Sequence, residues 1–289
     1  MKKINILISG TSGFLGGEFL KNSLQKNFKI TDLLKKKKLN HLKKNYKNYN
    51  SLIIDKSDNY LKKLNKIEIN TFLNFATYYV GNHDAKDISR LIDSNILFPT
   101  KILDKIYNKI QSLIFFGSIM EFSNKNKFDP QNLYAATKKS FETILKFYKK
   151  KNKKLKIYKI ILFDTFGKND ERAKIIPNII KSIKNNKKLN LANKNLTMNF
   201  VSPKNINQII FKMIENKLKP GTYLIKNCKN TRLKVLIDKL NKDNKKKIKV
   251  KYNNKTTYKP NNKKLINVRQ IKVKFNLEKE ITETINEIN

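Results

Sequence analysis

Cysteine, histidine and tryptophan are scarce or absent in this sequence of 289 residues, and their scarcity narrows what the chain can do. The single cysteine, Cys228, excludes an internal disulfide, and with only His41 and His83 as further ligands a structural zinc site is not expected. No apolar run reaches the roughly 18 residues that a membrane-spanning helix needs. Glycines interrupt the apolar run that follows the N-terminal Met-Lys-Lys, which argues against a signal peptide. We therefore expect a cytoplasmic protein that holds no metal and does not enter a membrane.

Arginine is also rare, because it supplies only four of the 64 basic residues, although the formal net charge is +42. Base readout and bidentate phosphate contacts favour arginine over lysine, and the lysines are spread along the whole chain among asparagine and isoleucine. This pattern is typical of a compositional bias with a solvated lysine surface, so nucleic acid is not the expected partner. A basic surface that binds an anionic partner is the alternative.

The first part of the chain alternates apolar runs with amphipathic stretches, which is typical of a parallel sheet with helical crossovers. We expect an α/β fold in which residues 1–167 form a Rossmann-type, doubly wound parallel sheet with helices on both faces. The expected strands are Ile4–Ser9, Phe28–Leu34, Ser51–Asp55, Ile69–Ala76, Ser112–Gly117 and Leu155–Phe163. The expected helices are Phe14–Gln25, Ala85–Tyr107, which Pro99 should bend, and Gln131–Lys150.

Residues 168–289 show a looser pattern, and we expect them to form a smaller, mixed α/β lobe that binds the substrate. Some of these segments are expected to return to the first domain. The expected helices are Ala173–Asn185, Lys204–Asn216 and Arg232–Asn241, and the expected strands are Leu189–Leu191, Thr222–Ile225 and Ile248–Tyr252.

A glycine-rich turn, Gly10-Thr-Ser-Gly13-Phe-Leu-Gly16, follows the first expected strand and opens a helix. Glycine lets the main chain pass close to a pyrophosphate, and the N–H groups at a helix N-terminus favour an anion. This placement predicts a dinucleotide site. The residues expected to contact the dinucleotide in this turn are Gly10, Ser12, Gly13, Phe14, Leu15 and Gly16.

The end of the second expected strand bears on which dinucleotide is bound. Cofactors without a 2′-phosphate usually meet an acidic residue there, about 20 residues past the glycines. The chain instead has Lys35, Lys36 and two more lysines, whereas Asp32 lies earlier, inside the strand. A lysine cluster suits a 2′-phosphate, so we expect NADP(H) bound by Lys35 and Lys36. NAD, with the lysines present by chance, is the alternative.

Tyr134 and Lys138 lie one helical turn apart in Tyr134-Ala-Ala-Thr-Lys138 and therefore share a helix face. A tyrosine loses its proton at about pH 10, and a nearby ammonium group should lower that pKa. Ser118 directly follows the fifth expected strand, and parallel strands carry their ligand sites at the C-terminal edge. The three residues predict a catalytic group in which Tyr134 exchanges a proton with a carbonyl or alcohol oxygen.

Together these motifs resemble the extended short-chain dehydrogenase/reductase family of nucleotide-sugar epimerases, dehydratases and reductases. Asn74-Phe-Ala-Thr77 after the fourth strand, and Asn95 in the following helix, match the family as well. The resemblance implies that Ser118 holds the carbonyl oxygen, that Tyr134 is the acid/base and that Lys138 binds the nicotinamide ribose. It also implies a homodimer, a nucleotide-sugar substrate, and cofactor contacts from Ala76 and from Asn95, which supports the central helix. The substrate contacts that it implies are Tyr78, Ser118, Ile119, Met120, Tyr134, Asp164 and Arg172.

Within the family, the segments Leu133–Glu142 and Leu162–Gly167 resemble CDP-abequose and CDP-paratose synthases. This resemblance implies an NADP(H)-dependent reductase of a nucleotide-linked 4-keto-deoxysugar that serves polysaccharide synthesis. The chain departs from the family where Thr197–Val201 lacks an arginine that grips phosphate in many relatives. Arg172 and Lys174 are candidates to replace that contact.

Two other functions stay open. One is an NAD-dependent nucleotide-sugar 4-epimerase that keeps its cofactor bound, and the other is a catalytically inactive protein of the same fold with a basic binding surface. Glu121, three residues after Ser118, is interpreted as structural, with a role in orienting substrate or as an extra acid as the alternative.

Overall fold

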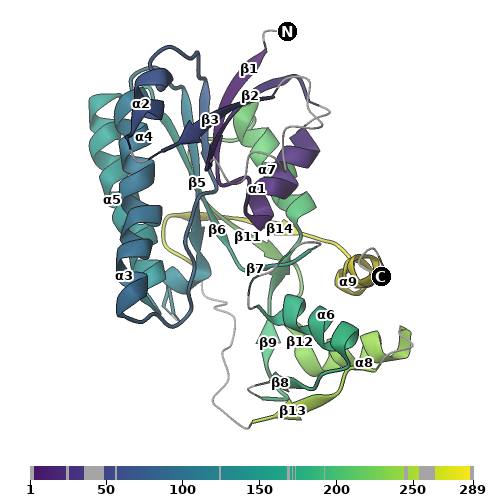
Figure 1. The fold of residues 1–289 in the computed structure, drawn as a ribbon. Helices are drawn as coiled ribbons and strands as arrows, with labels where there is room; N and C mark the ends of the chain where they lie inside the picture. Colours follow the sequence, from purple (N-terminus) through teal and green to yellow (C-terminus); the bar gives the residue numbers. More distant parts are fainter. Residues whose placement is uncertain are drawn as a thin grey trace.

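The computed structural model describes residues 3–23, 26–35, 49–55, 57–123, 125–167, 170, 172, 174–191, 193–243, 247–253 and 264–286. Eight strands form the main sheet: β1 (Ile4–Ser9), β2 (Phe28–Lys35), β3 (Tyr49–Ile54), β4 (Thr71–Asn74), β5 (Ser112–Ser118), β6 (Lys156–Leu162), β11 (Gly221–Asn227) and β14 (Val268–Val273). Their order is β14-β11-β6-β5-β4-β1-β2-β3, and every neighbouring pair is parallel (Figure 1). The predicted doubly wound α/β fold is confirmed.

Helices cover both faces of this sheet (Figure 1). One face carries α1 (Phe14–Ser23) and α7 (Pro203–Ile214), and the other carries α2 (Asn59–Leu64), α4 (Phe98–Ile106) and α5 (Leu133–Lys151). Side chains of neighbouring residues in one strand point to opposite faces of the sheet. Ile6 and Ile8 pack with α1 and α7, whereas Leu7 packs with α2 and α4. Because both faces are buried, the strands are apolar at consecutive positions rather than at alternate ones.

The long helix expected over Ala85–Tyr107 is interrupted, as its proline indicated. It consists of α3 (Ala85–Ile92), a π-helical segment η2 (Asp93–Leu97) and then α4, whose second residue is Pro99. Proline lacks the N–H that a continuous helix would use, and a π-helical turn is one way to accommodate it. The wider turn contains Asn95, whose buried side chain forms hydrogen bonds with Thr77, which follows β4, and with Thr137 of α5.

A smaller lobe follows β6 and has an apolar core of its own. Its helices are α6 (Ile175–Asn185), α8 (Leu233–Asp243) and α9 (Leu277–Asn286). Its short strands pair as β7 (Asp164–Thr165) with β10 (Phe200–Val201), β9 (Thr197–Met198) with β12 (Thr231–Arg232), and β8 (Leu189–Leu191) with β13 (Val250–Tyr252). None of the described helices is both long enough and apolar enough to cross a membrane.

One strand expected in the smaller lobe belongs elsewhere. The segment Thr222–Ile225 lies in β11, which pairs with β6 and β14 in the main sheet. Tyr223, Leu224 and Ile225 are all buried, as a strand with helices on both faces requires. The main sheet therefore includes strands from beyond residue 167. A division of the chain into domains at that residue stays a prediction.

Candidate active site

The glycine turn lies where the order of the strands reverses. β1 is followed along the chain by its neighbour β2 on one side, and its neighbour on the other side is β4. Ligands of such sheets bind at this switch point, beyond the carboxyl ends of the strands. The Gly13 N–H donates to the Gly10 carbonyl at 3.0 Å, and α1 begins at the next residue, Phe14.

The turn leaves room for a ligand only because it contains glycine. Gly10 has φ +84°, and a Cβ there would overlap the main chain of Ala76. A Cβ on Gly16 would overlap the Gly10 carbonyl. The loops after β1 and β4 thus lie main chain to main chain, beside the N-terminus of α1. This arrangement fits the pyrophosphate of a dinucleotide.

Asp32 anchors the turn from β2, a role that sequence reasoning missed. Its carboxylate is fully buried and accepts hydrogen bonds from Thr11 Oγ1 at 2.5 Å and from the Tyr49 hydroxyl at 2.7 Å. Burial raises the pKa of Asp32 to about 6. The residue at the exposed end of β2 is Lys35, and Lys36 lies outside the described residues.

Ser118 ends β5 and starts a short turn of 3₁₀ helix, η3 (Ile119–Glu121). The Ser118 N–H donates to Glu121 Oε1 at 2.8 Å, and the Met120 N–H donates to Ser118 Oγ at 3.2 Å. These reciprocal bonds form a capping box, which fixes both the main chain and the side chain of the serine. Ile119 is buried, and Met120 Sδ accepts a hydrogen bond from Asn132 Nδ2 at 3.6 Å.

Tyr134 and Lys138 lie on the first turns of α5. Asn132 caps this helix by accepting the Ala135 N–H at 2.9 Å. The Gln131 N–H donates to the Met120 carbonyl at 2.9 Å, and this bond holds η3 against the start of α5. Lys138 Nζ lies 5.4 Å from the centroid of the Tyr134 ring. The structure therefore brings the turn that begins at Ser118 together with the helix start that carries Tyr134 and Lys138.

The expected lowering of the Tyr134 pKa by Lys138 is wrong for the protein alone. Burial raises the pKa of Tyr134 far above its usual value, and Glu121 and Tyr79 raise it further. Burial also lowers the pKa of Lys138 to about 8. The ammonium group is itself desolvated, and its charge does not offset the burial of the phenol.

Asn95 joins the loop after β4 to the central helix. Its Oδ1 accepts from Thr77 Oγ1 and from the Tyr78 N–H, each at 2.8 Å. Its Nδ2 donates to the Tyr78 carbonyl and to Thr137 Oγ1, each at 3.0 Å. The amide thus spans from η2 to α5 and fixes the loop that passes beside Tyr134.

Of two neighbouring tyrosines, Tyr79 rather than Tyr78 lies against Tyr134. The Tyr79 and Tyr134 rings meet edge to face, with centroids 4.9 Å apart. The Tyr78 hydroxyl instead donates to Asp87 Oδ1 at 2.7 Å, and the Arg90 guanidinium lies 4.2 Å from its ring centroid.

The side facing the smaller lobe carries paired charges. Lys174 Nζ lies 2.9 Å from Asp164 Oδ1 and 5.2 Å from the centroid of the Tyr79 ring. Arg172 is held by Asp170, with Nε 2.6 Å from Oδ1. The same guanidinium lies 4.9 Å from the ring centroid of Phe14 in the glycine turn. Of the two predicted substrate residues, Arg172 therefore lies beside the glycine turn, and Asp164 is paired with the lysine that lies beside Tyr79.

Sequence reasoning missed a buried lysine behind Ser118. Lys159 of β6 lies 2.5 Å from Glu121 Oε2 and 2.6 Å from Glu142 Oε2 of α5. The signal was present, because a lysine within the apolar run Leu155–Phe163 needs a buried partner.

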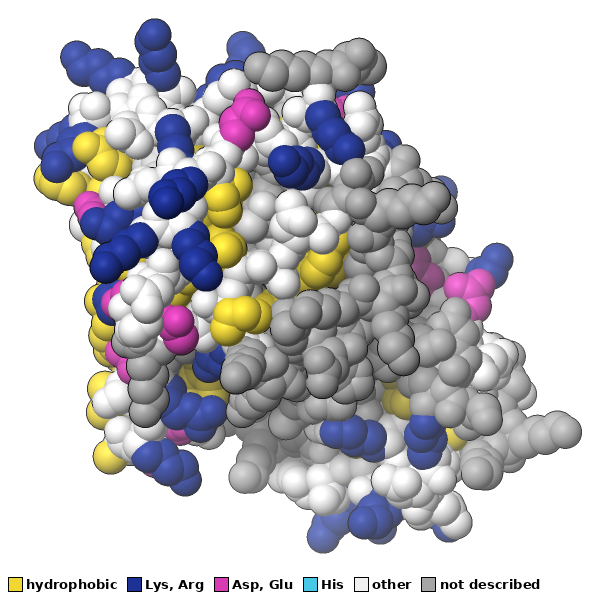
Figure 2. Space-filling view, turned by 45° about the horizontal axis from the view of Figure 1, so that its top comes forward, with side chains coloured by type: hydrophobic (Ala, Val, Ile, Leu, Met, Phe, Trp, Pro, Cys, Tyr) yellow, Lys and Arg dark blue, Asp and Glu magenta, His cyan; other side chains and the backbone are white. Residues whose placement is uncertain are grey.

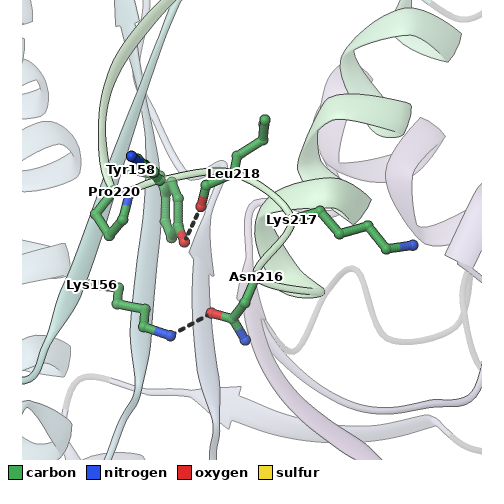
Figure 3. Close-up of a pocket in the computed structure, with 7 residues that line it drawn as sticks. Lys156, Tyr158, Asn216, Lys217, Leu218 and Pro220 are labelled. Atoms are coloured by element: carbon green, nitrogen blue, oxygen red, sulfur yellow. Dashed lines mark hydrogen bonds between the residues drawn. The ribbon is translucent and has the colours of Figure 1, made fainter.

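A separate pocket opens at the opposite edge of the sheet and has a volume of about 230 Å³. Lys156, the first residue of β6, donates from Nζ to Asn216 Oδ1 at 2.8 Å, and the Tyr158 hydroxyl donates to the Leu218 carbonyl at 3.0 Å (Figure 3). These bonds tie β6 to the α7–β11 connection. No carboxylate or histidine lines this pocket, whereas Ser118, Tyr134 and Lys138 lie at the carboxyl edge of the sheet.

The fold and the glycine turn are those of a dinucleotide-binding protein that carries a serine, a tyrosine and a lysine at the carboxyl edge of its sheet. Among the residues that the structure describes, no group of three or more His, Cys, Asp or Glu could hold a metal ion. Residues 6–225 match the sequence profile of the NAD dependent epimerase/dehydratase family. The chain belongs to this family, within the extended short-chain dehydrogenases/reductases, and is an NAD(P)-dependent enzyme.

Curated relatives include two bacterial CDP-abequose synthases. The protein of Yersinia pseudotuberculosis is 31% identical over 132 residues, which are 45% of this chain and 45% of the relative. The match therefore covers less than half of the length of that relative. The protein of Salmonella muenchen is 22% identical over 221 residues, 75% of this chain and 72% of the relative.

Solved structures share the fold along the whole chain. The UDP-N-acetylglucosamine 4-epimerase of Methanobrevibacter ruminantium has a TM-score of 0.78 at 21% identity and covers 100% of this chain and 99% of its own. A UDP-glucuronic acid 4-epimerase of Bacillus cereus, solved with NAD, has a TM-score of 0.80 at 17% identity and covers 99% and 100%. A dTDP-glucose 4,6-dehydratase of Bacillus anthracis in complex with NAD has a TM-score of 0.76 at 18% identity and covers 99% and 97%.

Proposed function

We propose that this enzyme is an NADP(H)-dependent reductase of a nucleotide-linked 4-keto-deoxysugar. The observation that carries the proposal is the joining of Ser118 at the end of β5 to the start of α5, which presents Tyr134 and Lys138. The similarity to CDP-abequose synthases supports a sugar nucleotide as the substrate. We place the reaction in the cytoplasm, where its substrate and cofactor would be available.

In this proposal Ser118 and Tyr134 act on the ketone oxygen, and Lys138 acts on Tyr134. The bound nicotinamide supplies the hydride that the carbonyl carbon receives. Ser118 donates a hydrogen bond to the carbonyl oxygen and favours the negative charge that develops there. Tyr134 then gives its proton to that oxygen, which becomes the alcohol. Its raised pKa keeps the phenol protonated until the ketone oxygen, which becomes strongly basic as the carbon receives hydride, takes the proton. Lys138 stabilises the tyrosinate that remains, until solvent returns the proton.

The choice of NADP(H) rests on the end of β2. Lys35 is exposed there, whereas the carboxylate of Asp32 is fully buried and bonded to Thr11 and Tyr49. An acidic side chain would favour a free ribose 2′-hydroxyl and repel a 2′-phosphate, and a lysine does the reverse. A preferred cofactor raises the melting temperature in proportion to its occupancy. NADPH should therefore shift melting more than NADH, and a larger shift with NADH would contradict this part of the proposal.

The substrate would lie between Tyr79 and the smaller lobe. Lys174 and Arg172 are the cations beside this space, and both now pair with carboxylates, Asp164 and Asp170. We propose that Lys174 exchanges its carboxylate partner for a phosphate of the substrate. Ile119, Met120, Tyr78 and Asp164 are proposed to border the sugar.

The test is NADPH consumption with 4-keto-deoxysugars linked to CDP, UDP and dTDP. Tyr134→Phe should lower kcat by about 10²–10⁴, because it removes only the donated proton. The NADPH-dependent melting shift of the variant should match that of the parent protein. Unchanged turnover in Tyr134→Phe would refute the proposal.

The solved epimerases favour a second candidate, a nucleotide-sugar 4-epimerase. An epimerase returns the hydride to the opposite face of the sugar and retains its NAD. Protein purified with tightly held NAD, and no net use of added NADPH, would favour this candidate. Salt-sensitive RNA binding with no effect of Tyr134→Phe on any activity would instead favour the inactive protein with a basic surface.

We also propose that the enzyme is a homodimer joined through α3 and α5. Ile88 and Ile92 on α3 and Phe147 on α5 are exposed apolar side chains, at 44%, 40% and 52%. Analytical ultracentrifugation tests this assembly, and a monomer at micromolar concentration would contradict it.

A further inference from the structure

A buried ion triad lies behind Ser118, and none of its members contacts the substrate in the proposed reaction. The side chain of Glu121 is 0% exposed and that of Lys159 is 4% exposed, with Oε2 and Nζ 2.5 Å apart. Glu142 approaches the same ammonium at 2.6 Å. Taking charges out of water is costly, and apolar side chains of similar volume often give equal or greater stability. The triad is therefore better explained by the position in which it holds the Ser118 main chain than by a contribution to stability.

Each oxygen of the Glu121 carboxylate has its own partner. Oε2 pairs with Lys159, and Oε1 accepts the Ser118 N–H at 2.8 Å. An apolar side chain could fill this space but could not accept that N–H. Lys159 thus links β6 through Glu121 to the last residue of β5.

The same cap orients the serine side chain. Ser118 Oγ accepts the Met120 N–H at 3.2 Å, so one lone pair of the oxygen is directed into η3. The O–H of the hydroxyl is then the part that can donate to a substrate oxygen. The capping box depends on Glu121, because its carboxylate provides the second of the two bonds.

Gly117 makes this packing feasible. A Cβ there would lie 2.5 Å from Glu121 Oε1 and 2.5 Å from Lys159 Cε. The glycine before Ser118 therefore leaves the space in which the carboxylate reaches the main chain of β5.

We propose that Glu121 is a positioning residue: held by Lys159, it fixes Ser118 so that the serine hydroxyl donates to the substrate oxygen. This inference rests on the proposed reduction. A misplaced donor no longer stabilises the developing negative charge, and loss of one such donor costs about 10²–10³ in kcat. Cofactor binding, which takes place at the glycine turn, should be unaffected.

A double-mutant cycle tests whether Glu121 acts through Ser118. Kinetics of ketone reduction are measured for Ser118→Ala, Glu121→Ala and the double variant. Each single variant should lose about a hundredfold in kcat, with the KM for NADPH within about twofold. The double variant should be no slower than Ser118→Ala, because a residue that acts through a missing hydroxyl has nothing left to position.

Glu142→Gln is the matched control, because Glu142 makes the same contact with Lys159 but none with Ser118. It should lower the melting temperature and leave kcat within about twofold. If Glu121→Ala does not fold, Glu121→Gln with Lys159→Met replaces it. The glutamine oxygen can still accept the Ser118 N–H, no buried charge is left alone, and Glu142 keeps Lys139 at 3.1 Å. This variant should retain kcat within about fivefold of the parent.

The outcomes separate this inference from the proposed function. If Tyr134→Phe reduces ketones as fast as the parent protein, the proposed function fails. If Tyr134→Phe is inactive but Glu121→Ala keeps its kcat, the positioning role is overturned. It is also overturned if the double variant loses kcat by the product of the losses in Ser118→Ala and Glu121→Ala. A variant with Glu121→Gln and Lys159→Met that is as slow as Ser118→Ala would overturn it as well.

Discussion

At the scale of single residues, the site depends on groups whose protonation is set by burial. Tyr134, Lys138 and Asp32 are ionisable side chains whose pKa values burial shifts towards the neutral form. The sequence predicted the first two as a catalytic pair from their helical spacing together with Ser118 at the end of the fifth expected strand. It could not predict the size of the burial effect, which depends on Tyr79, Thr77 and η3 closing around them.

Lys138→Met should stabilise the protein while it removes activity. Below pH 8 the folded state holds a buried ammonium, which opposes folding, and this cost fades as the pH rises from about 8 to 10.5. The variant should gain about 3 kcal/mol in unfolding free energy at pH 7, and the gain should vanish near pH 10.5. Urea unfolding at several pH values measures it. Lys146→Met, at an exposed position of the same helix, should change stability by less than about 0.5 kcal/mol.

Asp32 should make stability fall as the pH rises through the weakly acidic range. Its folded-state pKa, about 6, lies above the ordinary value of 3.8, so the folded state holds a proton that the unfolded state has released. The stability from this neutral acid is complete below pH 3.8 and is lost as the pH rises through 6. Between pH 4 and 7, Asp32→Asn should gain about 3 kcal/mol relative to the parent protein. A constant difference between the two proteins across this range would contradict the assignment.

At the scale of elements, sequence periodicity predicted what is long and regular. Seven strands of the main sheet and the helices α1, α5, α6, α7 and α8 lie within a few residues of their expected positions. The shortest of the elements that were not predicted have no periodicity to detect. β7, β9, β10 and β12 have two residues each, and α2 has six. β14 carries exposed residues at an edge of the sheet, so its pattern is weak.

The same limit applied to the site. The Gly10-x-x-Gly13-x-x-Gly16 turn, Ser118 and the pair on α5 follow regular elements and could be predicted. Contacts between distant segments could not, and these include Thr11 with Asp32, Glu121 with Lys159, and Lys174 with Tyr79. Such contacts depend on how elements pack, which a single sequence does not specify.

The junction of β5 and η3 should not tolerate a side chain at Gly117. The Cβ of Gly117→Ala would push Glu121 and Lys159 apart, and overpacking of this kind costs about 1–3 kcal/mol. Urea unfolding should show that loss, together with a lower kcat. Gly81→Ala is the control for stability, because its Cβ would have only one contact, at 3.7 Å from the Tyr79 hydroxyl. Equal stability of Gly117→Ala and the parent would mean that the junction adapts freely.

At the scale of the whole molecule, the net charge of +42 is the most unusual property. Lys and Arg side chains are scattered over those parts of the face in Figure 2 that are coloured by type, and they do not gather in one patch. A scattered charge of one sign favours solubility and opposes compactness through self-repulsion. Within the coloured parts of that face, no single basic patch marks a nucleic-acid site.

Salt should therefore stabilise this protein. Raising NaCl from 0.1 M to 1 M shortens the screening length from about 10 Å to about 3 Å. We expect a gain of about 1 kcal/mol, which corresponds to about 2–4 °C in melting temperature. Differential scanning calorimetry at the two salt concentrations measures it, with KCl as a check against specific ion effects. A melting temperature that falls with salt would mean that local ion pairing outweighs the repulsion.

The path of the chain between the main sheet and the smaller lobe has a mechanical consequence. The chain leaves the sheet after β6, returns at α7, leaves again after β11, and departs once more from β14 to α9. Because several chain connections join the two parts, we expect them to move little relative to each other and the substrate to enter through small local movements. Protease cleavage of any one connecting segment should give two fragments under denaturing conditions. In native solution the two fragments should remain associated.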